Sequence, residues 1–274
     1  MFKKILENVS NCPPLVHSIT NYVTVNDCAN IMLACGGAPI MADDINEVEE
    51  IISICNALVI NIGTLNERTV AAMIKAGKKA NRLGRPVILD PVGAGASTLR
   101  TSTVFKLLEE VQFSVIRGNV SEIKTIDQGS GTTKGVDADI SDAVNTDNLD
   151  QMIAFAKALS EKTGAVIAMT GAIDIVADSQ KALVIRNGHP MMSLITGTGC
   201  MLTAVIGSYC GANPDHLLLA TAAAVSCIGL CGELAFEKVQ TNQAGTASFR
   251  TYLIDAVSLM NAQTLEGGIK LETR

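Results

Sequence analysis

The chain has 274 residues, of which 48% are hydrophobic, 18% are charged and 3% are aromatic, with no tryptophan. Its core must therefore be packed from aliphatic and small side chains, and its length suits one large α/β domain or two average domains. The 21 basic and 27 acidic residues give a net charge of −6, and Lys and Arg do not cluster with interleaved aromatic residues, which argues against a nucleic acid partner.

The amino-terminal segment does not have the pattern of a signal peptide, because Glu7 and Asn8 interrupt its apolar stretch at once. We therefore expect a cytoplasmic protein. The 8 cysteines are scattered, and the closest pairs lack the C-x-x-C spacing. Buried thiols are expected rather than disulfides or a zinc site.

Short runs of β-forming residues alternate with helical stretches through much of the chain. Four runs end in a polar residue or glycine and are typical of parallel strands buried on both faces: residues 57–63, 86–90, 113–117 and 165–170. Helices are expected at about 67–82, 101–111 and 148–162. This alternation predicts a doubly wound sheet with right-handed crossovers. Residues 174–178 and 182–186 are expected to add an antiparallel hairpin at its edge.

The segment after Cys200 is expected to be wholly helical. One helix runs to about Tyr209, a second is opened by Asn213 and Pro214, and a third covers about 248–262. Because no linker separates these helices from the sheet, we expect a single domain.

Two other segments are distinctive in composition. Residues 128–145 are rich in Gly, Thr, Asp and Ser and are expected to form a mobile loop or insertion. Residues 217–231 carry no charge but are too few to span a membrane. We interpret them as a buried helix or an oligomer face.

Residues 196–200, Thr-Gly-Thr-Gly-Cys, combine glycines, a predicted helix start and a thiol. The first N–H groups of such a helix are unpaired, so Gly197, Thr198 and Gly199 are expected to form an anion hole for phosphate oxygens. The same field is expected to lower the pKa of Cys200, which can then take a proton from a substrate hydroxyl. The alternative is a core helix that starts with glycines and carries a buried cysteine.

Polar residues close the predicted strands, where ligands bind in open α/β sheets. Asp90 and Glu122 would together suit Mg²⁺ held largely through water and phosphate oxygens. Taken singly, an Asx turn or helix cap for Asp90 and a solvated first-turn carboxylate for Glu122 are the favoured interpretations. Arg117 offers a fork for phosphate oxygens, or else an ion pair with Glu122. By default, His17 is a hydrogen-bonded core histidine and Met41 is ordinary packing.

Two common nucleotide motifs are incomplete. Gly93-Ala94-Gly95 begins like a dinucleotide fingerprint, but Thr98 stands where the third glycine belongs. Gly77 is followed by two lysines and Ala80 rather than by the Lys and Ser or Thr of a P-loop. Any nucleotide therefore needs a different cradle.

Six segments, in order, resemble the hydroxyethylthiazole kinase family of ribokinase-like enzymes. They are residues 17–21, 38–42, 61–64, 88–95, 116–119 and 196–200. Six ordered matches are far more specific than any single one. The resemblance implies a three-layer αβα ribokinase-like fold over residues 1–274, with a mostly parallel central sheet and helices on both faces.

The resemblance also implies the reaction and part of the site. The family transfers the γ-phosphate of ATP, with Mg²⁺, to the primary alcohol of 4-methyl-5-(2-hydroxyethyl)thiazole in thiamine salvage. It works as a homotrimer with active sites between subunits. By match of motifs, Met41 and Gly197 would contact the thiazole, and Arg117 and Thr170 would hold the ATP phosphates.

The remaining matched residues concern the metal and the base. Asp90 and Glu122 would support the magnesium, and Cys200 would stand where most of the wider superfamily has an aspartate base. Thr198 departs from the family, in which alanine is frequent at that place. Two alternatives remain: another ribokinase-fold vitamin kinase, for hydroxymethylpyrimidine or pyridoxal, and a non-catalytic nucleotide- or vitamin-binding protein. The first would be expected to carry Asp in place of Cys200.

Overall fold

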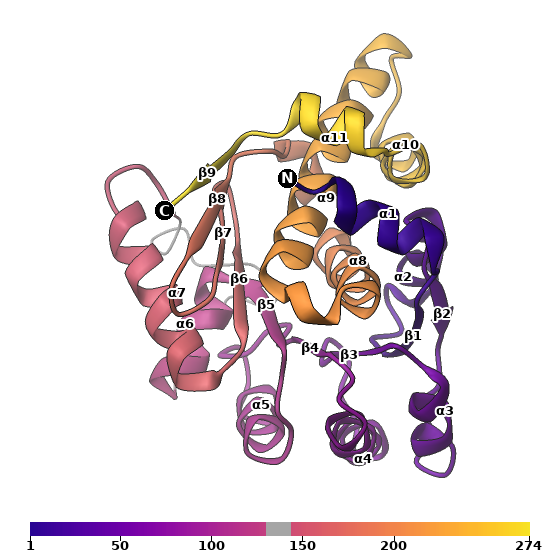
Figure 1. The fold of residues 1–274 in the computed structure, drawn as a ribbon, viewed down its shortest axis with the longest axis vertical. Coiled ribbons are helices and arrows are strands. Elements are labelled where there is room, and N and C mark those ends of the chain that lie inside the picture. The colour runs from indigo at the N-terminus through magenta and orange to yellow at the C-terminus, as the bar shows by residue number, and fades with distance from the viewer. Residues whose placement is uncertain (130–143) are drawn as a thin grey trace.

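The computed structural model describes residues 1–129 and 144–274. The loop predicted at residues 128–145 therefore lies almost wholly outside the described residues. The described chain forms a sheet of nine strands between two layers of helices (Figure 1). This mixed α/β architecture confirms the predicted fold class.

The sheet has the strand order β2-β1-β3-β4-β5-β6-β7-β8-β9. Its strands are β1 (Leu15–Ile19), β2 (Ala38–Ile40), β3 (Ala57–Asn61), β4 (Val87–Asp90), β5 (Val115–Asn119), β6 (Val166–Thr170), β7 (Asp174–Ala177), β8 (Ala182–Ile185) and β9 (Leu271–Thr273). Strands β1 to β6 pair in parallel, and β7 to β9 are antiparallel. The four predicted parallel strands and the hairpin are confirmed.

Strand β9 corrects the expectation that the chain is wholly helical after Cys200. Its three residues are half-buried or exposed, and their pattern carries no strand signal. Strand β9 forms because it pairs with β8. At the end of β9, the backbones of Ala182 and Arg274 donate a hydrogen bond to each other. The third predicted helix is also interrupted, since a helix ends at Ser258 and another begins at Ala262.

The helices divide between the two faces of the sheet (Figure 1). On one face lie α3 (Val48–Ile54), α4 (Glu67–Arg82), α5 (Thr98–Glu110), α6 (Val120–Gln128) and α7 (Leu149–Thr163). On the other lie α1 (Lys3–Asn11), α2 (Val25–Ala34), α8 (Thr198–Ala212), α9 (Leu217–Thr241), α10 (Thr246–Ser258) and α11 (Ala262–Gly268). Each layer encloses its own cluster of buried apolar side chains.

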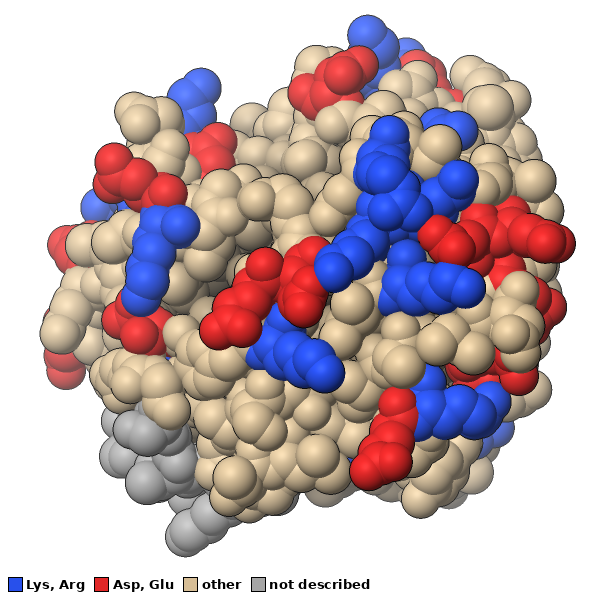
Figure 2. All heavy atoms as spheres, turned by 90° about the horizontal axis from the view of Figure 1, so that it is seen from below, with Lys and Arg blue, Asp and Glu red and all other residues tan. Residues whose placement is uncertain are grey.

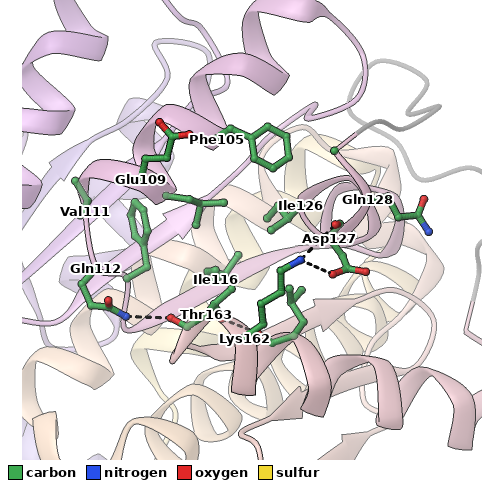
Figure 3. A pocket seen from close by; sticks show the side chains of 14 residues that line it. Phe105, Glu109, Val111, Gln112, Ile116, Ile126, Asp127, Gln128, Lys162 and Thr163 are labelled. Atoms are coloured by element: carbon green, nitrogen blue, oxygen red, sulfur yellow. Dashed lines mark hydrogen bonds and ion pairs between the residues drawn. The ribbon is translucent and has the colours of Figure 1, made fainter.

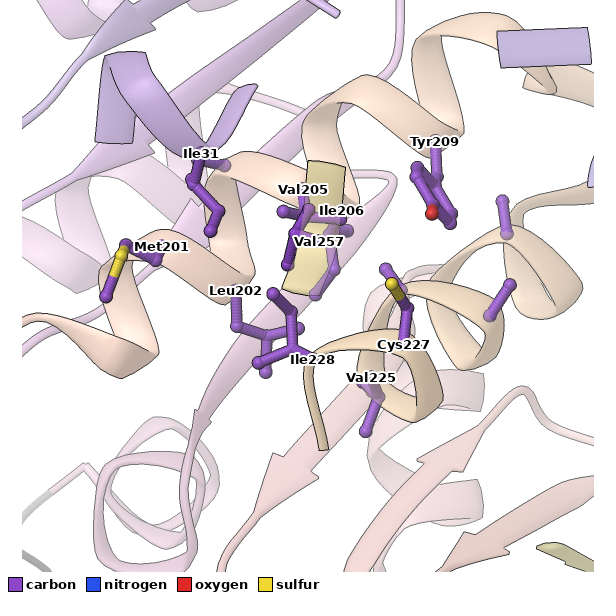
Figure 4. Close-up of a cluster of buried hydrophobic side chains, with 14 of the residues drawn as sticks. Ile31, Met201, Leu202, Val205, Ile206, Tyr209, Val225, Cys227, Ile228 and Val257 are labelled. Carbon is purple, nitrogen blue, oxygen red and sulfur yellow. The ribbon is translucent and has the colours of Figure 1, made fainter. Parts of the chain in front are cut away.

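Helices α8 and α9 form the centre of the second layer. Figure 4 shows apolar side chains from these helices and their neighbours converging, with Leu202 beside Ile228. Within the described residues, the segment Pro214–Thr241 is long and apolar enough to cross a membrane, but 72% of its apolar window is buried inside the protein. It is therefore packed as a core helix, which favours the first interpretation of residues 217–231.

The outer face of the first layer carries charges of both signs. Figure 2 shows Lys and Arg gathered there with Asp and Glu beside them. Along α4, Lys75 and Arg82 both pair with Glu49, and Lys78 pairs with Glu110. These ion pairs partly neutralise the positive charge of α4.

Candidate active site

Parallel pairing brings the polar ends of four strands to one edge of the sheet. Asn61, the last residue of β3, lies in register with Asp90, the last of β4. Asn119 at the end of β5 is likewise opposite Thr170 of β6. The first turn of α8 lies over this edge, because a Cβ placed on Gly199 would lie 2.8 Å from Nη2 of the β5 arginine.

Asp90 and Arg117 form a buried ion pair at this edge, with Oδ1 and Nη1 3.6 Å apart. Oδ2 of Asp90 accepts hydrogen bonds of 2.8 Å from Asn61 and Thr203, and Nη2 of Arg117 donates one of 2.7 Å to Thr170. Among the described residues, neither Oδ1 of Asp90 nor Nε of Arg117 has a hydrogen-bond partner. Burial raises the pKa of Asp90, and the guanidinium of Arg117 opposes that shift. Neither an Asx turn nor a helix cap describes this carboxylate.

Glu122 is buried, so the interpretation of this residue as a solvated carboxylate in the first turn of a helix is wrong. Its Oε2 accepts a hydrogen bond of 2.8 Å from the N–H of Asn119 and completes the capping box of α6. Its Oε1 accepts one of 2.8 Å from the N–H of Gly93. Burial, followed by the negative charge of Asp90, raises the pKa of Glu122 to about 7. The ion pair of Arg117 is made with Asp90, not with Glu122.

The first turn of α8 leaves its amides available. Gly197, the N-cap residue, has a φ of 89°, and a Cβ there would lie 2.6 Å from Cγ2 of Thr24. Glycine is therefore required both by the left-handed conformation and by the close approach. No side chain in the described part of the chain caps this helix. The N–H groups of Thr198, Gly199 and Cys200 have no intrahelical acceptors, and these residues are half-buried rather than sealed inside the protein.

Cys200 differs from the expectation in its electrostatics. Burial, and then the charge of Asp90, raises the pKa of Cys200, although hydrogen bonds from Thr24 and Asn61 act in the opposite direction. The predicted lowering of this pKa is wrong for the structure, because removal from water outweighs the favourable field of one helix terminus. Cys200 is nevertheless half-buried at the edge, and its sulfur accepts hydrogen bonds of 3.3 Å from Asn21 and Asn61.

Met41 lies at the same edge of the sheet but directly after the outermost strand, β2, so β1 and β3 separate it from β4. It is half-buried and packs against the cluster that contains α8. His17 of β1 supports this segment, since its Nε2 is 2.7 Å from the carbonyl oxygen of Ala42. Burial lowers the pKa of His17, as expected for a hydrogen-bonded core histidine.

The structure adds residues to which the sequence assigned no role. Asn21 and Asn61 lie within matched motifs, and Thr203 is one helical turn beyond the glycines of α8. Asp174 is buried and accepts a hydrogen bond of 2.9 Å from the N–H of Gly171. Of these, Asn61 had a usable signal, because it closes a strand next to the one that ends in Asp90.

The larger of two cavities does not lie at the carboxyl edge of the sheet. One cavity of about 520 Å³ lies between α5, α6 and α7 near the start of β5, and Figure 3 shows Lys162 and Asp127 paired beside its apolar wall. Another, of about 380 Å³, is lined by Tyr22, Gly63 and Arg100 and borders the edge described above. Polar groups of the larger cavity are paired with one another, Lys162 with Asp127 and Gln112 with the carbonyl of Thr163. At the carboxyl edge, by contrast, buried atoms of Asp90 and Arg117 have no hydrogen-bond partner among the described residues, so we place the candidate active site there.

Comparisons with known proteins converge on one family. The sequence model of the hydroxyethylthiazole kinase family matches residues 6–263. The chain is 60% identical to the hydroxyethylthiazole kinase of Clostridium acetobutylicum over 273 residues, which cover 100% of both chains. The structure of hydroxyethylthiazole kinase from Pyrococcus horikoshii is similar with a TM-score of 0.88 and 32% identity, covering 100% of this chain and 98% of the other.

A more distant structure supports the fold alone. A ribokinase-like superfamily protein from Enterococcus faecalis has a TM-score of 0.59 and 12% identity, covering 93% of this chain and 95% of the other. The ribokinase-like architecture implied by the sequence motifs is thus confirmed.

Proposed function

This chain belongs to the hydroxyethylthiazole kinase family, and we propose that it transfers the γ-phosphate of ATP to the primary alcohol of 4-methyl-5-(2-hydroxyethyl)thiazole in thiamine salvage. One observation carries the proposal. The uncapped first turn of α8 approaches the Asp90–Arg117 pair closely and presents the half-buried thiol of Cys200 at the same edge. Phosphate-binding groups and a proton acceptor are thus combined where α/β sheets bind ligands.

The charged groups have distinct roles in the proposed transfer. Arg117 and Thr170 hold the phosphates of ATP, and the amides of Gly197, Thr198 and Gly199 neutralise charge on the migrating phosphoryl group. Cys200 accepts the proton of the alcohol as its oxygen attacks in line with the leaving ADP. Phosphoryl transfer has a loose transition state, in which positioning and charge neutralisation dominate. A cysteine is therefore a sufficient base even when burial raises its pKa.

The carboxylates fit a magnesium ion. Oδ1 of Asp90 is a buried acceptor without a hydrogen bond among the described residues, and its ion-pair partner, Nη1 of Arg117, is 3.6 Å away. The oxygen can therefore still accept a hydrogen bond from a water on a bound cation. No group of three or more metal-ligating side chains occurs in the part of the chain that is described, and Mg²⁺ is usually held by one or two carboxylates together with substrate phosphates. Asp90 and Glu122 would hold the ion, partly through water. When bound, Mg²⁺ neutralises charge on the phosphate oxygens.

The substrate side involves the residues around β1 and β2. Met41 and Gly197 contact the thiazole ring, and the active sites lie between the subunits of a homotrimer in the cytoplasm. Apolar side chains next to the site support this assembly, since Tyr22 is 79% exposed and Leu194 is 66% exposed. Each subunit contributes one ribokinase-like domain, residues 1–274. Light scattering at micromolar concentration tests the assembly, and a monomeric mass would refute it.

ATP consumption tests the reaction directly. We expect Mg²⁺-dependent turnover with the thiazole alcohol and much less with hydroxymethylpyrimidine or pyridoxal. Preference for either of these would assign the chain to another vitamin kinase activity. Tight ATP binding without turnover on any of the three alcohols would favour a non-catalytic binding protein.

A further inference from the structure

Two buried asparagine side chains converge on the sulfur of Cys200. Nδ2 of Asn21, after β1, and Nδ2 of Asn61, at the end of β3, each lie 3.3 Å from Sγ. Both residues are at most 4% exposed. The sulfur thus accepts from two amides delivered by neighbouring strands, although α8 carries the cysteine itself.

The hydrogen-bond network leaves these amides only one orientation. Each Nδ2 has two hydrogens. Asn61 uses its second for Oδ2 of Asp90 at 2.8 Å, and Asn21 uses its second for Oδ1 of Asn61 at 3.0 Å. A flipped Asn61 would set its oxygen against both the carboxylate and the sulfur. All four amide hydrogens are therefore engaged, and the two that reach Sγ are held in place.

The side-chain oxygens of Asn21 and Asn61 are also held by hydrogen bonds. Oδ1 of Asn21 accepts hydrogen bonds of 3.1 Å from both N–H and Oγ1 of Thr24, and Oδ1 of Asn61 accepts one of 2.9 Å from the N–H of Gly63. A Cβ on Gly63 would lie 2.9 Å from both Cβ and Nδ2 of Asn21. Packing as well as hydrogen bonding thus fixes Asn21.

We propose that Asn21 and Asn61 are positioning residues that hold the Cys200 sulfur beside Asp90, at the point from which it takes the proton of the substrate alcohol. This inference rests on the proposed kinase function. In that step, which uses the small thiolate fraction of Cys200, the O–H bond breaks as an S–H bond forms, and the oxygen electron pair makes the new bond to the γ-phosphorus. ADP leaves with the electrons of the broken P–O bond. Two N–H donors facing Sγ match its negative charge before the transfer.

The first test compares Asn21→Ala with Asn213→Ala. Asn213 is a buried asparagine at the opposite end of α8, where Nδ2 donates to the carbonyls of Ile5 and Tyr209. We expect kcat to fall about 10- to 100-fold in Asn21→Ala, the loss typical of hydrogen bonds to a charged group, with KM for ATP unchanged. Asn213→Ala is expected to lower the melting temperature without changing kcat.

A double-mutant cycle separates positioning from direct substrate contact. In a Cys200→Ala background, Asn21→Ala is expected to have no further effect on kcat, because the atom it positions is gone. An equally large effect in both backgrounds would overturn the proposal. If Asn21→Ala does not fold, Gly63→Ala displaces Asn21 by contact and is expected to behave in the same way.

Crystal structures of the Asn21→Ala and Asn213→Ala proteins supply a readout that does not depend on turnover. We expect the Cys200 side chain to leave its present rotamer in the first protein and to keep it in the second. An unmoved Sγ in Asn21→Ala would contradict the inference even if the enzyme is active. Lack of activity in the unmodified protein would instead count against the proposed function, and the position of Sγ would still decide the inference.

Discussion

The first turn of α8 and the body of the same helix are built in opposite ways. Thr198, Gly199 and Cys200 are half-buried and have no side-chain cap, whereas the residues from Met201 to Cys210 are all buried. Helix α6, by contrast, begins with a complete capping box. The apolar body holds α8 in position through packing, so its first turn can leave amides free for a ligand. The proposed function of the first turn is thus supported by the burial of the rest of the helix.

The largest effect on this arrangement is expected from Arg117→Ala. It removes the cation next to the first turn of α8 and leaves the buried carboxylate of Asp90 without its ion-pair partner. We expect kcat/KM to fall roughly 10²- to 10³-fold, as when a preorganised donor is lost. Steady-state kinetics with ATP measure the change, and Arg117→Lys, which keeps the charge but not the fork, is expected to lie in between. Turnover within a factor of about two of the unmodified protein would exclude a phosphate-binding role.

Cys200→Ala tests the reacting end of the same turn. We expect kcat to fall about 10²-fold, at the lower end of the range for a lost general base, because burial already raises the pKa of this thiol. ATP affinity should be nearly unchanged, since in the proposed mechanism the amides and not the sulfur hold the phosphates. Isothermal titration measures the affinity. An unchanged kcat would remove the assignment of Cys200 as the base.

Two glycine substitutions on α8 contrast its ends directly. In Gly199→Ala the new Cβ meets the guanidinium of Arg117, which must shift and loosen its contacts with Asp90 and Thr170. We expect about a 10-fold loss of kcat/KM, with a smaller loss of stability than in the second variant. In Gly207→Ala the Cβ would lie 2.5 Å from Cγ2 of Val59, a stiff side chain in the sheet. That variant is expected to lose about 1–3 kcal/mol of stability and to keep its activity per folded molecule. Urea unfolding measures the stability of both variants, and steady-state kinetics measure their activity. A larger loss of stability in Gly199→Ala together with a loss of activity in Gly207→Ala would contradict the comparison.

The smallest effect concerns pH and Asp174, whose pKa burial raises to about 7 from an ordinary value of 3.8. Between these values the folded protein keeps a proton that the unfolded chain has released, so stability falls as pH rises through this window and is constant above it. Asp174→Asn can still accept the hydrogen bond from Gly171 but cannot titrate. Melting temperatures at about pH 5 and about pH 8 should differ less in this variant than in the unmodified protein. An identical difference would mean that Asp174 does not titrate in this window.

The elements best predicted were those with strong local patterns. Helix α4 matches its expected range, and the apolar runs of β3, β4, β5 and β6 were all found. The short strand β2 contains a proline and only three residues, and two of the three residues of β9 are polar. Such strands form because a neighbour supplies hydrogen-bond partners, so the local sequence does not indicate them.

The sequence by itself determined the family, the alternation of strands and helices, and the polar residues that close the strands, because these depend on local pattern and motif order. Only the tertiary structure decided their electrostatics. Burial raises the pKa of Cys200, whereas a lowered pKa was expected from the helix start. Glu122 is buried as well, although its place in the first turn of a helix had suggested a solvated carboxylate. The tertiary structure also brought the side chains of Asn21 and Asn61 to the sulfur of Cys200. Desolvation and hydrogen-bond partners depend on chain segments far apart in sequence, so they exist only once the sheet has formed.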